Sequence, residues 1–265
     1  MPYPNFKNKY KERALFSPKD YFFYHERRGN TIKVAPPQGV IFCYSSLLLK
    51  YILENHKVKR TSFFGDRNMM ADGEMYMLTE SRNKVALAGR FGIGAPAVIP
   101  LCEELIEWGV KRFISIGTAG TLQPGISIGD LVVCERAIRD EGTSHHYIKP
   151  SKYASSSKQL TKKLEMTLDE LGQPYIRGTS WTIDAVYRET IAEARQYRKE
   201  GVITVEMEAA ALFAVAQYRK VQMSAMFTIS DILGEKKWQP HMHHKQTKAG
   251  LETLYKAAVK TLLSA

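Results

Sequence analysis

The chain has 265 residues, 44% of them hydrophobic and 25% charged, which is enough for one large buried core and typical of a single α/β domain. Its net charge of +11 at pH 7 attracts anions, yet no aromatic and basic ladder typical of nucleic-acid binding accompanies the lysines and arginines. A nucleic-acid partner therefore ranks below a small-molecule substrate. The sequence contains no run of about 18 apolar residues, which argues against a membrane span.

The N-terminal segment and the cysteines indicate the cellular compartment. Residues 1–30 form a polar, aromatic and basic extension without the apolar core of a signal peptide. Cys43, Cys102 and Cys134 lie in apolar surroundings without metal-ligand spacing, which favours free thiols over a disulfide framework. Three histidines gather at positions 241, 243 and 244, but no carboxylate or cysteine partner is evident. We therefore expect a cytoplasmic protein without a bound metal.

Hydrophobic periodicity predicts strands and helices in alternation along the chain. The predicted strands cover 39–44, 60–65, 74–78, 84–88, 112–116, 130–137, 175–181, 201–205 and 221–229. The predicted helices cover 46–54, a segment after Gly94 that ends near Trp108, 158–171, 189–199, 209–218 and 244–263. Such interleaving implies a central mixed, twisted sheet with helices on both faces. We expect one α/β domain over 31–265, preceded by the basic extension.

Two carboxylates flank a methionine where a predicted strand runs into a helix, in the order Glu206, Met207, Glu208. Open α/β sheets bind their ligands at such strand-to-helix corners. Acidic residues also favour the first turn of a helix, where they complement the helix dipole. That structural explanation leaves the apolar neighbours unexplained, so the pattern indicates a binding site at this corner.

Two glycine-rich turns are predicted near the same edge of the sheet. Residues 89–96 link a strand to a helix, and Gly117-Thr118-Ala119-Gly120 follows another strand. Glycine lets a backbone approach a ligand closely, and a helix N-terminus offers free N–H groups to an anion. Each turn alone is a weak signal, because turns need glycine in any case. Together with the glutamate corner, the two turns predict one site at the strand ends.

The order and spacing of these segments resemble the nucleoside phosphorylase and nucleosidase family, which includes uridine phosphorylase, purine nucleoside phosphorylase and methylthioadenosine nucleosidase. The resemblance runs from about Gly39 to the C-terminus and is closest to uridine phosphorylase-like proteins around 92–94, 103–105 and 116–120. Residues 205–211 and the pair Ser230-Asp231 are closer to the purine enzymes. The resemblance implies the nucleoside phosphorylase fold and cleavage of the bond between ribose C1′ and a base.

The resemblance assigns ribose binding to the glutamate corner. Glu208 would accept hydrogen bonds from the ribose hydroxyls, and Glu206 would support the same pocket. Met207 would pack against the apolar face of the sugar, which suits a polarizable thioether. Because catalysis needs the sugar held and the departing base made less basic, Glu208 and Asp231 are the expected catalytic residues.

Asp231 is the expected general acid, since the matching aspartate of purine-cleaving relatives protonates or hydrogen-bonds N7 of the leaving base. Such a carboxyl must hold its proton at neutral pH, which burial favours. The alternative is that Ser230-Asp231 caps the following turn. Tyr187 is expected to stack on the base, and Arg188 to donate to an oxo-base unless it is a surface residue. A glutamine typical of the uridine enzymes is missing here, so the base stays open.

The phosphate site departs most from the family. Phosphorylases hold phosphate with an arginine in the strand before the Gly-Thr-Ala-Gly segment, where this chain has Ser115. Nucleosidases activate water with a glutamate at the end of the first strand, and 44–46 supplies none. We expect a rebuilt phosphate site of Gly94, Arg90 and Thr118, with Arg67 as a candidate contribution from an adjacent subunit. Arg90 as a surface residue is the alternative.

Phosphorolysis of a nucleoside to free base and ribose 1-phosphate is therefore the expected reaction, with inorganic phosphate as co-substrate and no cofactor. Hydrolysis of a nucleoside or nucleotide, and a catalytically silent nucleoside-binding protein, are the alternatives because the family's phosphate-binding arginines are missing. The family completes its sites across a subunit boundary, so the resemblance implies a homo-oligomer, a dimer or a hexamer.

Overall fold

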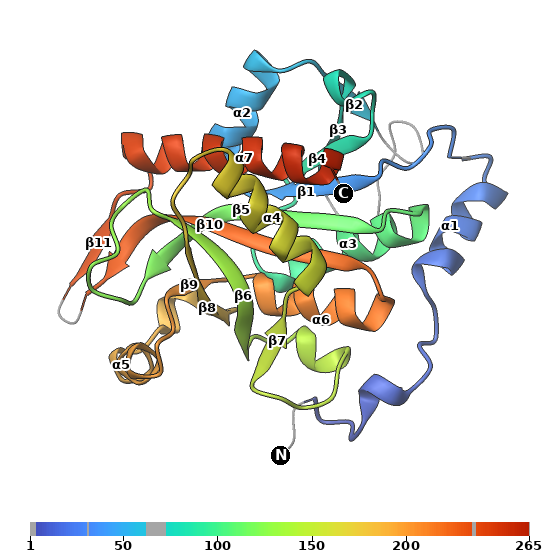
Figure 1. The fold of residues 1–265 in the computed structure, drawn as a ribbon. Coiled ribbons are helices and arrows are strands. Elements are labelled where there is room, and N and C mark those ends of the chain that lie inside the picture. The colour runs from blue at the N-terminus through green and yellow to red at the C-terminus, as the bar shows by residue number, and fades with distance from the viewer. Residues whose placement is uncertain (1–3, 31, 62–72, 235–236, 265) are drawn as a thin grey trace.

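A central mixed sheet with helices on both faces forms the body of the protein (Figure 1). The computed structural model describes residues 4–30, 32–61, 73–234 and 237–264. The strands are β1 (Gly39–Cys43), β2 (Val58–Thr61), β3 (Glu74–Leu78), β4 (Val85–Gly89), β5 (Arg112–Thr121), β6 (Leu131–Asp140), β7 (Tyr153–Ser155), β8 (Ile176–Ile183), β9 (Thr204–Glu206), β10 (Gln222–Leu233) and β11 (Trp238–Pro240). The helices are α1 (Pro18–Arg27), α2 (Ser46–Asn55), α3 (Ala95–Trp108), α4 (Lys158–Glu170), α5 (Ile191–Lys199), α6 (Ala209–Arg219) and α7 (Lys245–Ser264), with short 3₁₀ turns at η1 (Lys9–Lys11), η2 (Thr79–Ser81), η3 (Ser144–His146) and η4 (Val186–Arg188). The predicted fold class is confirmed.

Five of the strands close into a ring. β10 pairs with β5 along one edge and with β6 along the other, while β9 joins β8 to β5. β8 pairs with β6 and completes the circle. The remaining sheet extends from β5 through β1, β4, β3 and β2. The ring therefore brings the ends of β5, β9 and β10 together at one place.

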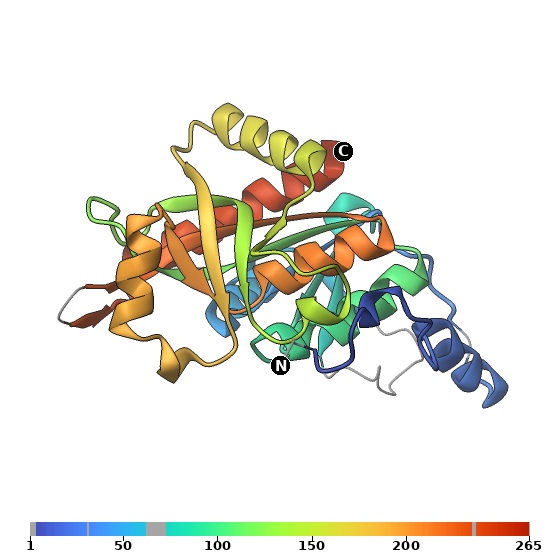
Figure 2. The same ribbon diagram turned by 90° about the horizontal axis from the view of Figure 1, so that it is seen from below.

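Side-chain alternation along the strands divides the core between two faces. In β1, Val40 and Phe42 pack in a cluster with α3 and α6, whereas Ile41 and Cys43 pack in a cluster with α2, α4 and α7. The two groups of helices lie on opposite sides of the sheet in Figure 1 and Figure 2. Because successive side chains of a strand point to opposite faces, a strand covered on both sides is apolar throughout. β1 and β4 are accordingly buried at every residue.

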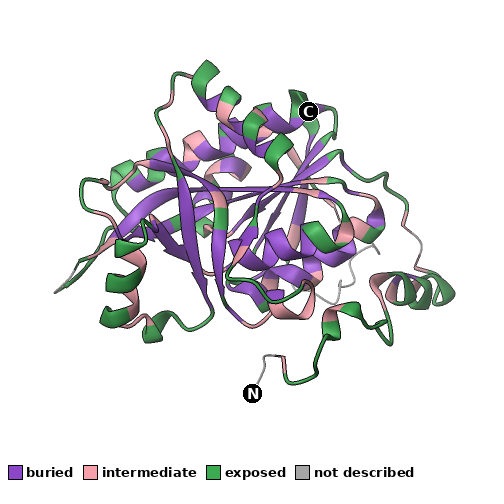
Figure 3. Cartoon of the chain, turned by 60° about the horizontal axis from the view of Figure 1, so that its bottom comes forward, coloured by how far each residue is buried: buried purple, intermediate pink, exposed green. Residues whose placement is uncertain are grey.

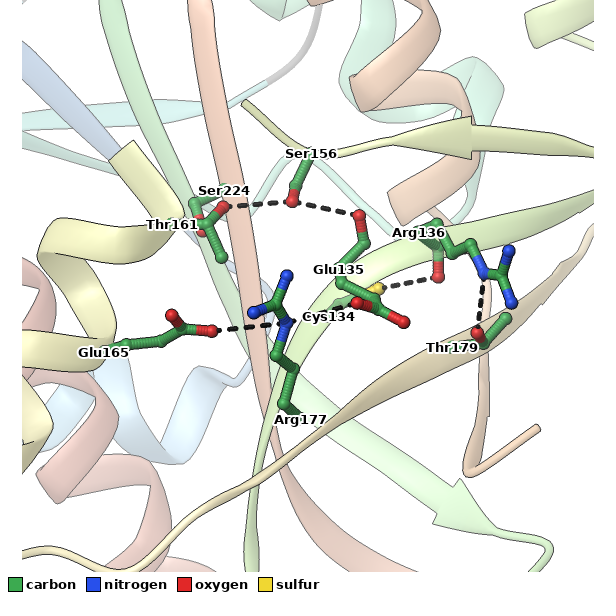
Figure 4. A network of polar contacts seen from close by, with 9 residues as sticks. All are labelled: Cys134, Glu135, Arg136, Ser156, Thr161, Glu165, Arg177, Thr179 and Ser224. Atoms are coloured by element: carbon green, nitrogen blue, oxygen red, sulfur yellow. Dashed lines mark hydrogen bonds and ion pairs between the residues drawn. The ribbon is translucent and has the colours of Figure 1, made fainter. Parts of the chain in front are cut away.

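A bulge in β6 is held by polar contacts. The pairing of β6 with β8 changes register between Cys134 and Arg136, so Glu135 is the extra residue. The Glu135 carbonyl accepts the backbone N–H and the hydroxyl of Ser156, both at 3.0 Å, while its carboxylate lies 3.1 Å from Nε of Arg177 (Figure 4). Arg177 also lies 3.5 Å from Glu165 on α4. These contacts hold α4 against β6 and β8.

Residues 4–30, expected as a basic extension, contain a helix that packs on the core. α1 begins at Pro18 with a capping box formed by Ser17 and Asp20, and its Phe22 is buried in the core cluster of α3. Several apolar side chains around it stay exposed, namely Phe6, Leu15, Phe16, Phe23 and Tyr24. The extension and α5 are the mostly exposed parts of the chain in Figure 3. Among the described residues, no helix is both long and apolar enough to cross a membrane.

Three predicted boundaries are wrong in ways that matter for the site. The segment 117–120, expected as a turn, continues β5 to Thr121. The strand expected to end at Ile229 continues as β10 to Leu233 and includes Asp231. The helix expected from Glu189 begins at Ile191, because Thr190 and Glu193 form a capping box there. The short strands β7 and β11 were not predicted.

Candidate functional site

A cavity of about 690 Å³ opens where β5, β9 and β10 meet. Its lining comes from β5 and β10, from the corner between β9 and α6, from the η4–α5 segment and from the turn into β11. These segments are far apart in sequence and are brought together by the closed ring. The cavity therefore lies at the strand ends, where the sequence predicted a binding site.

Thr118 presents the one exposed side chain of β5, whose other residues are buried or half-buried, and it lines the cavity. Gly117 and Gly120 do not form a turn; they allow neighbouring side chains to pack closely against the β5 backbone. A Cβ on Gly117 would lie 3.3 Å from the Tyr44 ring, and one on Gly120 would lie 2.8 Å from Oδ2 of Asp231. Glycine is therefore needed in β5 because side chains from β10 and the end of β1 press against its backbone.

Asp231 reaches the cavity through a second bulge. Ile229 pairs with Ala119 and Asp231 with Gly120, so Ser230 is the extra residue in β10. A bulge redirects the following side chain, which is a common device beside active sites. Asp231 is buried, and its two oxygens accept hydrogen bonds from the Ser230 hydroxyl at 2.7 Å and the Trp238 indole N–H at 2.8 Å.

Glu206 ends β9 and holds the start of α6. Its carboxylate accepts four hydrogen bonds, from the hydroxyls of Ser180 and Thr182 and from the backbone N–H groups of Glu208 and Ala209, at 2.5–3.1 Å. Burial raises its pKa, and these four donors oppose the shift. Glu206 therefore holds the backbone between β9 and α6 in place.

Glu208, the second carboxyl group of the corner, accepts fewer hydrogen bonds from the protein than Glu206 does. It is buried at the N-terminus of α6, lines the cavity and accepts a 2.5 Å hydrogen bond from the Gly94 N–H. Burial, with the Glu206 charge beside it, raises the pKa of Glu208 to about 8. Met207 lies between the two glutamates and lines the same cavity, with its methyl carbon near Gly94. The predicted corner of Glu206, Met207 and Glu208 is therefore assembled as one unit.

The two side chains expected at the base differ in position. Tyr187, in η4, lines the cavity although its side chain is 98% exposed, so its ring can move onto a ligand. Arg188 is exposed in the same turn and does not line the cavity. The cations that line it are instead Arg195, Arg198 and Lys237.

Residues 40–264 match the family model of the Phosphorylase superfamily. The chain belongs to the phosphorylase superfamily. This superfamily chain is 34% identical over 141 residues to a uridine phosphorylase of Thermococcus kodakarensis, a segment that covers 47% of this chain and 50% of that relative. It is 33% identical over 189 residues to a DeoD-type purine nucleoside phosphorylase of Caldanaerobacter subterraneus subsp. tengcongensis, covering 71% of this chain and 79% of the relative.

A solved uridine phosphorylase from Vibrio fischeri ES114 has the same fold, with a TM-score of 0.70 and 27% sequence identity over 87% of this chain and 92% of that one. The resemblance found in the sequence is therefore confirmed. Relatives named for uridine and for purine nucleosides match this member of the superfamily about equally well, so their names leave its base open.

The residues expected at the phosphate do not gather around the cavity. Ser115, in place of the arginine, is buried and donates a 3.3 Å hydrogen bond to the hydroxyl of Tyr44. Burial raises the pKa of Tyr44 well above its usual range, and the Glu208 charge adds to it, so the hydroxyl stays protonated. Arg90 is 60% exposed and pairs with Glu74 at 3.3 Å, outside the cavity lining. Arg67 lies outside the described residues.

Glu189 and Trp238 are two of the cavity residues that were not predicted from the sequence. Glu189 lines the cavity next to the start of α5, and Trp238 on β11 binds Asp231. The capping box at Thr190 and Glu193 was the available signal for Glu189, since it places the helix start beyond that residue. Trp238 had no signal, because β11 is only three residues long. Among the described residues, no group of three His, Cys, Asp or Glu could hold a metal ion.

Proposed function

We propose that this chain cleaves the N-glycosidic bond of a nucleoside by phosphorolysis, releasing the free base and ribose 1-phosphate. The supporting observation is that Glu208, Asp231 and Thr118 face one cavity in a chain that belongs to the phosphorylase superfamily. The relatives named as uridine and purine nucleoside phosphorylases support the same reaction. No protein group in the proposal requires a cofactor, and inorganic phosphate is the co-substrate.

Each side chain has a proposed role. The ribose lies against Met207, and its hydroxyls donate to Glu208, whose position is fixed by Glu206. As the C1′–N bond lengthens, positive charge develops on the sugar, and the oxygens of the buried carboxyl groups stabilise it by their partial negative charge in a site of low dielectric. The base lies between Tyr187 and Asp231. These contacts would favour the transition state over the bound nucleoside.

Phosphate is proposed to lie beside the Thr118 hydroxyl and the turn at Gly94. Gly94 has a φ of +92°, a conformation that glycine adopts without strain, and it is the N-cap residue of α3 beside the lining residue Ile93. Arg90 would reach this place only after releasing Glu74. A phosphate dianion needs at least one cation, and Arg90 lies outside the cavity lining, so we propose that a basic residue of a second subunit completes the site.

A cytoplasmic homo-oligomer is part of the proposal. The extension exposes Leu15 almost completely and Phe16 and Phe23 by more than half, an unusual density of apolar surface for a free segment. Such side chains suit burial against a second copy. Analytical ultracentrifugation tests this point, and a monomer at micromolar concentration would contradict it.

Base release tests the reaction itself. Purine and pyrimidine nucleosides and their 5′-monophosphates are incubated with the enzyme, each with and without phosphate. The proposal expects release that requires phosphate and yields ribose 1-phosphate, with a phosphate KM several-fold higher in Thr118→Val. Thr253→Val, on α7 and away from the cavity lining, is the matched control. Phosphate-independent release would indicate a hydrolase, and nucleoside binding without release would indicate a silent binding protein.

A further inference from the structure

We propose that Trp238 is a positioning residue for Asp231: its indole holds one carboxyl oxygen, so that the proton given to the leaving base sits on the other. The inference rests on the proposed nucleoside cleavage, with Asp231 as its general acid, the role that the resemblance implies. Trp238 Nε1 donates a hydrogen bond to Oδ2 of Asp231 at 2.8 Å, and both residues line the cavity. A direct contact thus joins Trp238 to the proposed acid.

The pairing of β11 with β10 explains why a tryptophan makes this contact. In this antiparallel pair Asp231 lies opposite Pro240, and Leu233 lies opposite Trp238 (Figure 1). Trp238 and Asp231 are therefore diagonal neighbours on one face, with a separation of about 7–8 Å that aromatic and long side chains can span. The length of the indole is what brings a donor from β11 to the carboxyl.

Packing does not explain the position of Trp238. All three residues of β11 are exposed, and Trp238 is 55% exposed although it lines the cavity. The backbone holds this part of the chain, since the His241 N–H donates to the Ser230 carbonyl at 2.8 Å and the Thr247 hydroxyl donates to the His241 carbonyl at 3.0 Å. A half-exposed indole gains little from burial. Its N–H, directed at a buried carboxyl, is therefore the feature that Trp238 contributes.

The two oxygens of Asp231 have different surroundings. A Cβ on Gly120 would lie 2.8 Å from Oδ2, so the β5 backbone lies directly against this oxygen, and the Trp238 indole approaches it from β11. The other oxygen, Oδ1, accepts a hydrogen bond from the Ser230 hydroxyl at 2.7 Å, and Ser230 lines the cavity. The carboxyl is thus held in one orientation, with a different partner on each oxygen.

The chemistry of these partners decides which oxygen carries the acid proton. An indole N–H donates and cannot accept, so Oδ2 stays an acceptor while this bond is kept. A serine hydroxyl both donates and accepts, and that of Ser230 can turn toward the Ala119 carbonyl, 3.5 Å away, when Oδ1 carries a proton. The proton of neutral Asp231 therefore sits on Oδ1. As that proton leaves, the indole bond strengthens, because a charged acceptor binds a donor more tightly.

The proposed step is balanced in atoms and charge. The C1′–N bond breaks and its electron pair passes to the base, while the proton on Oδ1 of Asp231 moves to a nitrogen of the base. An oxygen of hydrogen phosphate forms the new bond to C1′ and gives ribose 1-phosphate. Hydrogen phosphate loses its proton to solvent, and Asp231 takes one proton back. The Trp238 indole stays on Oδ2 throughout.

A double-mutant cycle tests whether Trp238 acts through Asp231. Wild type, Trp238→Phe, Asp231→Ala and the double variant are assayed with a nucleoside that wild type cleaves. Phenylalanine keeps an aromatic ring without the N–H, so kcat should fall about tenfold to a hundredfold, as for a misplaced catalytic group. In the Asp231→Ala background the same substitution should change kcat by less than about twofold, because the two residues act as one unit. Equal losses in both backgrounds would overturn the inference, and so would an unchanged kcat in Trp238→Phe.

Trp108→Phe is the matched control. It also removes an indole N–H, which here donates to the Val34 carbonyl at 3.1 Å, and Trp108 lies away from the cavity lining. Its kcat should stay within about twofold of wild type, as for a substitution outside the site. A loss as large as that of Trp238→Phe would mean that any lost indole bond lowers activity, and it would overturn the assignment.

NMR of protein labelled at the tryptophan indoles gives a readout without turnover, since the chain has three tryptophans. The signal that disappears in Trp238→Phe should move upfield in Asp231→Ala, where its acceptor is lost. The signals of Trp108 and Trp181, whose indoles donate to Val34 and Asp140, should stay in place. If wild type cleaves no nucleoside, the proposed function fails, while an unshifted Trp238 signal overturns the positioning role by itself.

Discussion

Replacing Glu208 with glutamine should stabilise the folded protein at alkaline pH and remove most of its turnover. The folded-state pKa of about 8 lies above the ordinary value of 4.5, because Glu208 is buried beside Glu206. Between these two values the folded protein holds a proton that the unfolded chain has released. The free energy of unfolding therefore falls as pH rises through this window. At about 1.4 kcal/mol for each pH unit, the full cost approaches 5 kcal/mol.

Urea unfolding at pH 5 and pH 9, at one fixed protein concentration, measures the effect. We expect wild type and Glu208→Gln to be nearly equal at pH 5 and to differ by several kcal/mol at pH 9, with the variant more stable. Glu54→Gln is the control. The Glu54 side chain is 60% exposed, so this substitution removes the same charge from the surface of the protein. Parallel stability curves for wild type and Glu208→Gln would refute the reasoning, and so would wild-type kcat in that variant.

Three further substitutions test the geometry of the site. Gly120→Ala places a carbon 2.8 Å from an Asp231 oxygen, so kcat should fall at least tenfold while the far-ultraviolet circular dichroism stays unchanged. Thr182→Val removes the hydroxyl that links Glu206 to the first turn of α6, and thermal unfolding should show a loss of about 1–3 kcal/mol relative to wild type. Arg90→Ala should leave the phosphate KM within about twofold, because its guanidinium lies outside the cavity lining, and a larger rise would place it at the phosphate.

The glutamate corner could be predicted because local signals coincide there. An apolar strand pattern stops at Glu206, a run of helix-forming residues starts at Ala209, and the intervening carboxylates have no simpler use. What could not be predicted is the division of labour between the two glutamates. Glu206 is saturated by donors from β8 and from the helix start, and those partners are 24 to 26 residues away or placed by the fold.

The glycines of β5 show why the other boundaries were missed. Gly117 and Gly120 look like turn residues in a sequence, but here they make room for Tyr44, which follows β1, and for side chains from β10. The ring that creates this crowding depends on pairings between strands that are far apart in sequence, such as β5 with β10. A single sequence contains no trace of those pairings. The same limitation hid Glu189, which lines the cavity only after the ring has closed.

The two sides of the cavity differ in how many amino-acid substitutions they tolerate. One side consists of strands that are covered on both faces. Thr118 is the single exposed residue of β5, so a substitution at almost any other position of this strand would disturb packing. On the other side stands α5, which contains no buried residue at all. Mutations can therefore accumulate at the exposed positions of α5 at little cost in stability, while the strand side of the cavity stays fixed. Substrate preference can diverge in such a protein without a change of reaction, and α5 is where a directed-evolution library would be placed.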